Sequence, residues 1–158
     1  MKRYLAILAA AWLMLGLACL HDAAAENAAV MYVHVRDGTY LNGRHDPVRD
    51  SAVEMRLYRG DEVAVIGLAD NWVQIEGGEA GSCWCCADYL ADYPPDEDPP
   101  LYTVVSNGRV RVRQSPDGKT VRYVRAGDTV EVRFVIDGWA FLGDGYVMAE
   151  YLERSKEL

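Results

Sequence analysis

A chain of 158 residues is long enough for one ordinary domain or for two very small ones. Its composition, 51% hydrophobic and 25% charged, is that of a folded globular protein and excludes a disordered or collagen-like chain. The net charge of -8 argues against nucleic acid as a partner, because phosphate binding requires a cationic surface.

The first 25 residues have the pattern of an export signal. A basic start, Met1–Arg3, precedes an uncharged apolar run, Tyr4–Leu20, and small residues follow at Ala23–Ala25. This order is typical of a signal peptide, so we expect cleavage after Ala25 and a mature chain that is secreted or held in the extracytoplasmic cell envelope. Two alternatives remain open, an uncleaved membrane anchor and a lipid attached to Cys19. Without either of them, we expect no membrane contact of the mature chain.

The rest of the chain contains an internal repeat. Gly60–Val65 (GDEVAV) recurs as Gly127–Val132 (GDTVEV) at an offset of 67 residues, and Trp84–Leu90 matches Tyr146–Leu152 at an offset of 62. The matched blocks follow one another in the same order in both copies. This arrangement indicates a duplication.

Between the two copies lies a short segment rich in proline and acid. Residues 91–100 (ADYPPDEDPP) hold four of the six prolines and four carboxylates. Such a composition predicts a semi-rigid spacer of roughly 30 Å at full extension. We therefore predict a first domain over residues 31–90, a linker over 91–100 and a second domain over 101–153.

Short alternating segments within each copy predict strands. Apolar residues occupy every second position at Val63 and Val65, and again at Val110 and Val112, while Asp-Gly or Asn-Gly dipeptides mark the turns. We find no convincing amphipathic helix in the mature chain. Each copy should therefore form about five short strands, closed or half-closed into a small barrel, in an all-β protein.

The second copy resembles a known family. The segments VRVRQSP, RAGDTVEV, DGWAFL and GYVMAEYL follow one another over Arg109–Leu152 and are similar to the bacterial SH3 domain, or SH3b. The first copy departs from that pattern at Gly43, where the family usually has an aliphatic residue, and at Ser82–Cys86. The resemblance implies two tandem SH3-like β-barrels, the first divergent, that act outside the cytoplasm as non-catalytic modules binding the cell wall or a peptide.

Aromatic residues at matching positions are the candidates for a binding groove. Trp72 and Trp139 each follow a turn, and Trp84 matches Tyr146 near the end of each copy. Aromatic faces can stack on a peptide or a sugar, although the same residues also suit the core of a small barrel. Because the first copy diverges, we expect the binding site in the second copy.

Three arginines form the polar candidate site. Arg109, Arg111 and Arg113 alternate along one predicted strand and share its face. They fit either a solvated sheet edge that prevents strand pairing or a contact to carboxylates or phosphates of a wall polymer.

A cysteine cluster is the most unusual feature. Alternation places Cys83 and Cys85 on one face of a strand and Cys86 on the other. Val147 matches Cys85 in the repeat, which favours a core position for this thiol. The three remain open as structural or free thiols, as a disulfide or intermolecular bridge, or as a redox pair. We predict no metal site, because adjacent cysteines point apart, and we predict no cofactor.

Two small barrels and a linker leave no room for a catalytic domain, so we predict that the chain is not an enzyme. The expected function is binding of peptidoglycan or another cell-envelope peptide. The alternative is an extracytoplasmic interaction or structural adaptor for an envelope protein, cross-linked through its cysteines.

Overall fold

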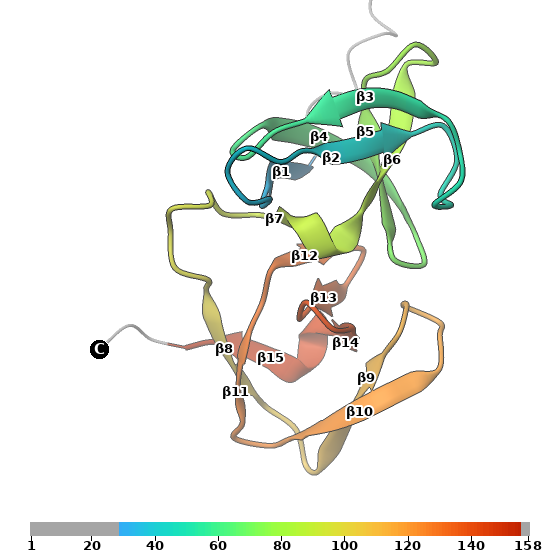
Figure 1. The fold of residues 1–158 in the computed structure, drawn as a ribbon. Helices are drawn as coiled ribbons and strands as arrows, with labels where there is room; N and C mark the ends of the chain where they lie inside the picture. The colour runs from blue at the N-terminus through green and yellow to red at the C-terminus, as the bar shows by residue number, and fades with distance from the viewer. Residues whose placement is uncertain (1–28, 156–158) are drawn as a thin grey trace, which may run out of the picture.

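The computed structural model describes residues 29–155, so the predicted signal peptide and Cys19 lie outside the described residues. The described chain is all-β, with two one-turn 3-10 helices (Figure 1). This confirms the predicted all-β class. Within the described residues, no helix is long and apolar enough to cross a membrane.

The first copy forms one seven-stranded antiparallel sheet that curls into a barrel. The strand order is β3-β2-β6-β5-β4-β1-β7, and the 3-10 helix η1 (Ala87–Tyr89) lies just before the last strand. The strands are β1 (Ala29–Val33), β2 (Leu41–Arg44), β3 (Val53–Leu57), β4 (Glu62–Ala69), β5 (Trp72–Glu76), β6 (Ser82–Cys86) and β7 (Leu90–Ala91).

The second copy repeats this order of elements in two smaller sheets. The sheets have the orders β10-β9-β14-β13-β12 and β11-β8-β15, and η2 (Ala149–Tyr151) precedes the last strand. The strands are β8 (Leu101–Val104), β9 (Arg109–Arg113), β10 (Thr120–Arg125), β11 (Thr129–Glu131), β12 (Phe134–Ile136), β13 (Trp139–Phe141), β14 (Tyr146–Met148) and β15 (Leu152–Arg154).

The repeated Gly-Asp motif builds the same turn in both copies. Gly60 and Gly127 have φ angles of +83° and +85°, a left-handed conformation that strongly favours glycine. The next residue in each copy, Asp61 or Asp128, accepts a hydrogen bond from the backbone N–H three residues earlier, at 2.8 and 2.7 Å. A local hydrogen bond of this kind fixes the turn and explains why both residues recur.

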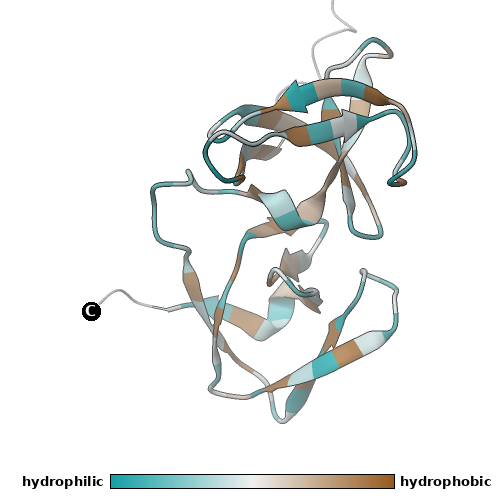
Figure 2. Cartoon of the chain, viewed as in Figure 1, coloured by the Kyte–Doolittle hydropathy of each residue, from teal (hydrophilic) through white to brown (hydrophobic). Residues whose placement is uncertain are grey.

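Strand alternation fills the two cores. The valines at the predicted inward positions of β4 and β9 are all buried, and the hydrophobic residues of Figure 2 are concentrated on the strands. The linker and most connecting loops are hydrophilic. A period of two therefore separates buried from solvated side chains.

The two barrels also share a hydrophobic contact. Phe134, Phe141 and Tyr146 of the second copy are fully buried in the same cluster as the core residues of the first copy. Their rings pack together, with centroids 5.1 Å apart for Phe134 and Phe141 and 4.8 Å apart for Phe141 and Tyr146. We call this set, with Trp139 packed against it, the junction cluster.

The linker differs from the extended spacer that its composition predicts. Ala91 belongs to β7, where it is buried and pairs with Tyr32 of β1. Residues 92–100 contain a turn, and Arg59 of the first copy donates hydrogen bonds to the Pro95 carbonyl at 3.0 Å and to Asp96 at 2.8 Å. Contacts to the first barrel thus hold the segment back, against the tendency of proline and like charges to extend it.

Candidate binding groove

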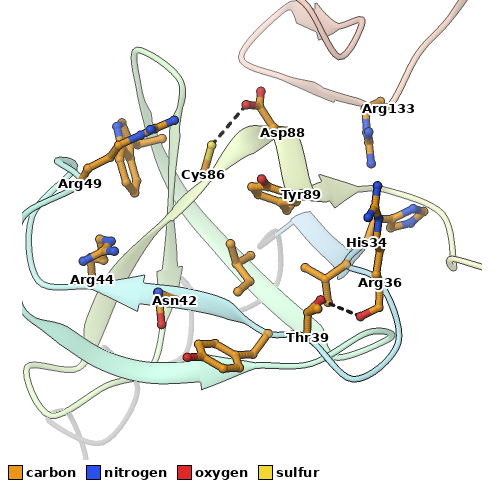
Figure 3. Close-up of a pocket in the computed structure, with 14 residues that line it drawn as sticks. His34, Arg36, Thr39, Asn42, Arg44, Arg49, Cys86, Asp88, Tyr89 and Arg133 are labelled. Carbon is orange, nitrogen blue, oxygen red and sulfur yellow. Dashed lines mark hydrogen bonds between the residues drawn. The ribbon is translucent and has the colours of Figure 1, made fainter.

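A groove of about 950 Å³ lies on the first copy, which is within the usual size of a ligand site. It follows the outer face of β2, β5 and β6 and is bordered by η1 and by the loop after β1. We call it the first-copy groove; its fourteen lining residues are His34, Val35, Arg36, Thr39, Tyr40, Leu41, Asn42, Arg44, Arg49, Trp72, Cys86, Asp88, Tyr89 and Arg133 (Figure 3).

Strand alternation directs the groove side chains outward. On β2, Leu41 and Gly43 are buried, whereas Asn42 and Arg44 are half-exposed. On the neighbouring strands, Trp72 pairs with Cys86 in register, and both are half-exposed. Successive side chains of a strand point to opposite faces, so the residues that leave the core create the floor of the groove.

Cations dominate the charge of the groove. Arg36, Arg44, Arg49 and Arg133 line it, and Asp88 is the one carboxylate among the fourteen lining residues. Within residues 29–155, none of these four arginines forms an ion pair with an acid. Each guanidinium has five N–H donors, so most donors remain free for a ligand.

Backbone carbonyls fix two of these arginines. Arg44 Nη1 donates to the Ser51 carbonyl at 2.7 Å, and Arg133 Nε donates to the Leu90 carbonyl at 3.3 Å. Arg133 belongs to the second copy, between β11 and β12. The groove is therefore built from both copies, although its volume lies on the first.

Aromatic side chains provide flat surfaces in the same groove. Tyr40 and Tyr89 are 46% and 47% exposed, and Trp72 is half-buried. The guanidinium of Arg56 lies 4.5 Å from the Tyr40 ring centroid and the Tyr58 ring 6.5 Å from it, which orients the Tyr40 side chain. Amphipathic rings of this kind favour contacts with peptide or sugar surfaces.

His34 is a neutral member of the groove at pH 7. Burial lowers its pKa, and the positive charges of Arg133 and Arg59 lower it further. Its Nε2 donates a hydrogen bond to the Tyr93 carbonyl at 2.7 Å, and the two rings form an edge contact at 5.0 Å. His34 therefore fixes the start of the linker beside the groove.

The three cysteines of the cluster are free thiols. Cys83 and Cys85 are fully buried and Cys86 is half-exposed, which is the alternation that the sequence predicts. Burial raises the pKa of all three, so the thiols are protonated and weakly nucleophilic at neutral pH. Burial also prevents Cys83 and Cys85 from reaching a partner protein, which leaves Cys86 as the accessible thiol of the cluster. Among residues 29–155, no group of three His, Cys, Asp or Glu is placed to hold a metal ion.

The four predicted groove aromatics are separated by the fold. Trp72 lines the first-copy groove, and Trp84 is half-buried on the same sheet face, paired with Arg44 but outside the lining. Trp139 packs against the junction cluster, and Tyr146 is completely buried there. Burial raises the pKa of Tyr146, whose side chain belongs to the same buried cluster as the core of the first copy.

The expected site in the second copy is therefore absent from the matching sheet face of the described chain. At the positions matching Gly67 and Gln74 of the first copy, the second copy has Phe134 and Phe141, and the first barrel covers them. A smaller hollow of about 730 Å³ beside η2 is lined by Val105, Ser106, Asn107, Glu150 and Tyr151, without an arginine. The burial of this face was indicated in the sequence, because β12 to β14 carry apolar residues on both faces. This pattern is typical of strands that are covered on two sides.

The predicted arginine row lies on β9, outside the first-copy groove. Arg109 and Arg111 are exposed and Arg113 is half-buried, on one strand face as predicted. Arg109 lies 5.2 Å from the Tyr123 ring centroid, and Arg113 donates to the Gly118 carbonyl at 2.9 Å. β9 pairs with β10 along its length but with β14 only at Arg113, so both interpretations of the arginine row remain predictions.

Most of the groove was not predicted from the sequence. The candidate site residues did not include the four groove arginines, nor Tyr40, Asp88 and Tyr89. These residues come from separate loops and strands, and nothing in their local sequence indicates that they share one surface.

No family model and no curated protein matches this chain. Among solved structures it is similar to NlpC1 from Trichomonas vaginalis, at 20% identity over 82% of this chain and 46% of that chain, with a TM-score of 0.35. NlpC2 from the same organism gives 20% identity over 82% and 49%, with a TM-score of 0.33. The CBD of the endolysin LysPBC5 gives 15% identity over 83% and 96%, with a TM-score of 0.38. The chain spans about half the length of the two NlpC chains, and we derive its function from the groove itself.

Proposed function

We propose that this chain is an exported, non-catalytic binding module of two tandem SH3-like barrels, and that its first-copy groove binds a peptide of the cell envelope. The observation that supports this proposal most directly is the lining of the groove. Four arginines without an acid partner in the described chain lie beside three partly exposed aromatic rings. Charged hydrogen bonds orient such a ligand, and ring faces contribute apolar contact.

The overall acidity of the chain does not oppose an anionic ligand. The linker and the loops carry much of the negative charge, whereas the groove concentrates cations around one carboxylate. A concave surface of one sign attracts ligands of the opposite sign even on a protein of like net charge. The local charge therefore decides which ligand the groove accepts.

A sedimentation assay with purified peptidoglycan sacculi tests this function. The purified chain should cosediment with sacculi, and Trp72→Ala should reduce the bound fraction several-fold, because buried aromatic anchors dominate binding energies. Tyr123→Ala is the matched control, since Tyr123 is 51% exposed on β10 and does not line the groove. Absence of the unmutated chain from the pellet would refute wall binding and favour the adaptor alternative.

A further inference from the structure

The cations of the first-copy groove are gathered at two ends. Figure 3 shows Arg44 and Arg49 on one side and Arg36 and Arg133 on the other, beside the neutral His34, with Tyr89 between the two sides. Arg133 and His34 lie at the same end in this view, and the positive charge of Arg133 helps to lower the pKa of His34.

Between the two ends, the border of the groove carries the opposite charge. Asp88 lies between the two ends, where one of its oxygens accepts a hydrogen bond from Asn71 Nδ2 at 2.9 Å and the other from Cys86 Sγ at 3.5 Å. A polymer with evenly spaced negative groups would bring one of them against Asp88. A ligand with negative groups only at its two ends avoids that repulsion.

Arg133 reaches the groove because the backbone of both copies holds it. Its N–H donates to the Phe141 carbonyl at 2.8 Å, and its carbonyl accepts from the Asp92 N–H at 2.7 Å. Its Nε uses one donor on the Leu90 carbonyl of β7. The remaining guanidinium donors are available at the His34 end, so the second barrel completes a site on the first.

We propose that the first-copy groove binds a peptide segment with a carboxylate at each end and an uncharged middle, and that Arg133 of the second copy binds one of the two carboxylates. This inference rests on the proposed binding function and specifies the chemistry of its ligand. A guanidinium fork matches a carboxylate through two parallel N–H···O bonds, which favours arginine at both ends. The Tyr89 ring between the ends contacts the uncharged middle.

Calorimetry with defined peptides tests the ligand class. The probe is acetyl-Glu-Ala-Ala with a free C-terminus, which has one carboxylate at each end, together with versions that contain one to three further alanines. The matched control is acetyl-Gln-Ala-Ala-amide, which has no carboxylate. We expect the best dicarboxylate to bind at least about tenfold more tightly than its uncharged control, since each charged hydrogen bond contributes to that degree.

Variants of the groove test the composite site. Arg133→Gln should weaken the dicarboxylate about tenfold, and Arg133→Lys should recover part of that loss. Arg36→Gln tests the same end without touching the junction, because Arg36 is exposed and has no side-chain hydrogen bond in the described chain. Arg125→Gln is the matched control, an exposed arginine of the second copy outside the groove. Thermal unfolding of each variant identifies any loss of folding.

The binding measurements can overturn the ligand class or the role of the second copy. Equal binding of charged and uncharged peptides, or no binding of any peptide, overturns the dicarboxylate ligand. Tighter binding of poly(glycerol phosphate) than of every peptide also overturns it. If Arg36→Gln and Arg44→Gln weaken binding but a folded Arg133→Gln does not, the contribution of the second copy is refuted.

The sacculus assay separates this inference from the proposed function. A chain that prefers the dicarboxylate but does not cosediment with sacculi supports the ligand chemistry and refutes the wall as its source. A chain whose sedimentation is unaffected by Arg36→Gln and Arg133→Gln retains the proposed function and overturns this inference.

Discussion

Gly43 of β2 and Cys83 of β6 meet in the core of the first barrel, and the second barrel has the same contact with the sizes exchanged. The repeat aligns Gly43 with Val112 and Cys83 with Gly145. A Cβ atom added to Gly43 would lie 2.6 Å from Cys83 Sγ, and one added to Gly145 would lie 2.8 Å from Val112 Cγ1. Each copy thus fills the contact with one glycine and one larger residue, which makes the two positions dependent on each other.

This dependence predicts the result of a double-mutant cycle. Gly43→Ala places a carbon 2.6 Å from both Cys83 Sγ and Met55 Cγ, and such overpacking costs roughly 1–3 kcal/mol of unfolding free energy. Cys83→Ala removes the sulfur and costs about 1 kcal/mol through lost burial. In the double variant the new carbon occupies space that the sulfur leaves, while the flexible Met55 side chain adjusts. We expect the double loss to be smaller than the sum of the single losses by about 1–2 kcal/mol.

Urea unfolding followed by tryptophan fluorescence measures the four free energies, because Trp72 and Trp84 report on the first barrel. The control cycle combines Gly145→Ala with Val112→Ala in the second barrel. There, the added carbon also lies 2.6 Å from the Arg113 backbone oxygen, which no side-chain truncation removes, so the recovery should be smaller. Losses in the first barrel that add to within about 0.5 kcal/mol would refute a shared contact.

Three further predictions follow from the described contacts. Ellman's reagent should leave Cys83 and Cys85 unmodified in the native chain, because both thiols are buried and burial raises their pKa. Both should react after unfolding, and a rapid reaction of either thiol in the native chain would contradict its burial. Burial lowers the pKa of His34, so His34 binds a proton more readily in the unfolded chain, and stability falls as the pH drops below about 6.5. The melting temperature of His34→Gln should therefore fall less between pH 7 and 5 than that of the unmutated chain. Equal decreases in the two melting temperatures would exclude this role of His34. Arg59→Ala should accelerate proteolysis within residues 92–100 relative to Arg56→Ala, since Arg59 holds the linker; an unchanged cleavage rate would show that other contacts hold it.

The all-β class could be predicted because its signals are local. The alternation at Val63 and Val65 and the glycine turns depend on neighbouring residues only, and the structure has strands and turns at these places. The divergence at Gly43 and Cys83 was also visible, but as two unrelated departures. Their compensation is a contact between β2 and β6, which are far apart in the sequence.

The site could be predicted only in part. Trp72 was selected because aromatic residues recur in the repeat, and it lines the first-copy groove. Trp139 and Tyr146 were selected for the same reason, yet they pack between the barrels because β12 to β14 have a second apolar face. Whether an aromatic residue binds a ligand or fills an interface depends on what covers it, and the repeat itself contains no information on this.

The sequence by itself determined the strand pattern, the duplicated order of elements and the alternation of the cysteines, because side-chain direction in a strand follows from a period of two. Only the tertiary structure decided which barrel carries an open groove and which face is buried. It also brought Arg133 to the side of His34, 99 positions away in the chain. That approach depends on apolar packing at the junction cluster and on the hydrogen bonds between Arg133, Leu90 and Asp92, which are long-range interactions.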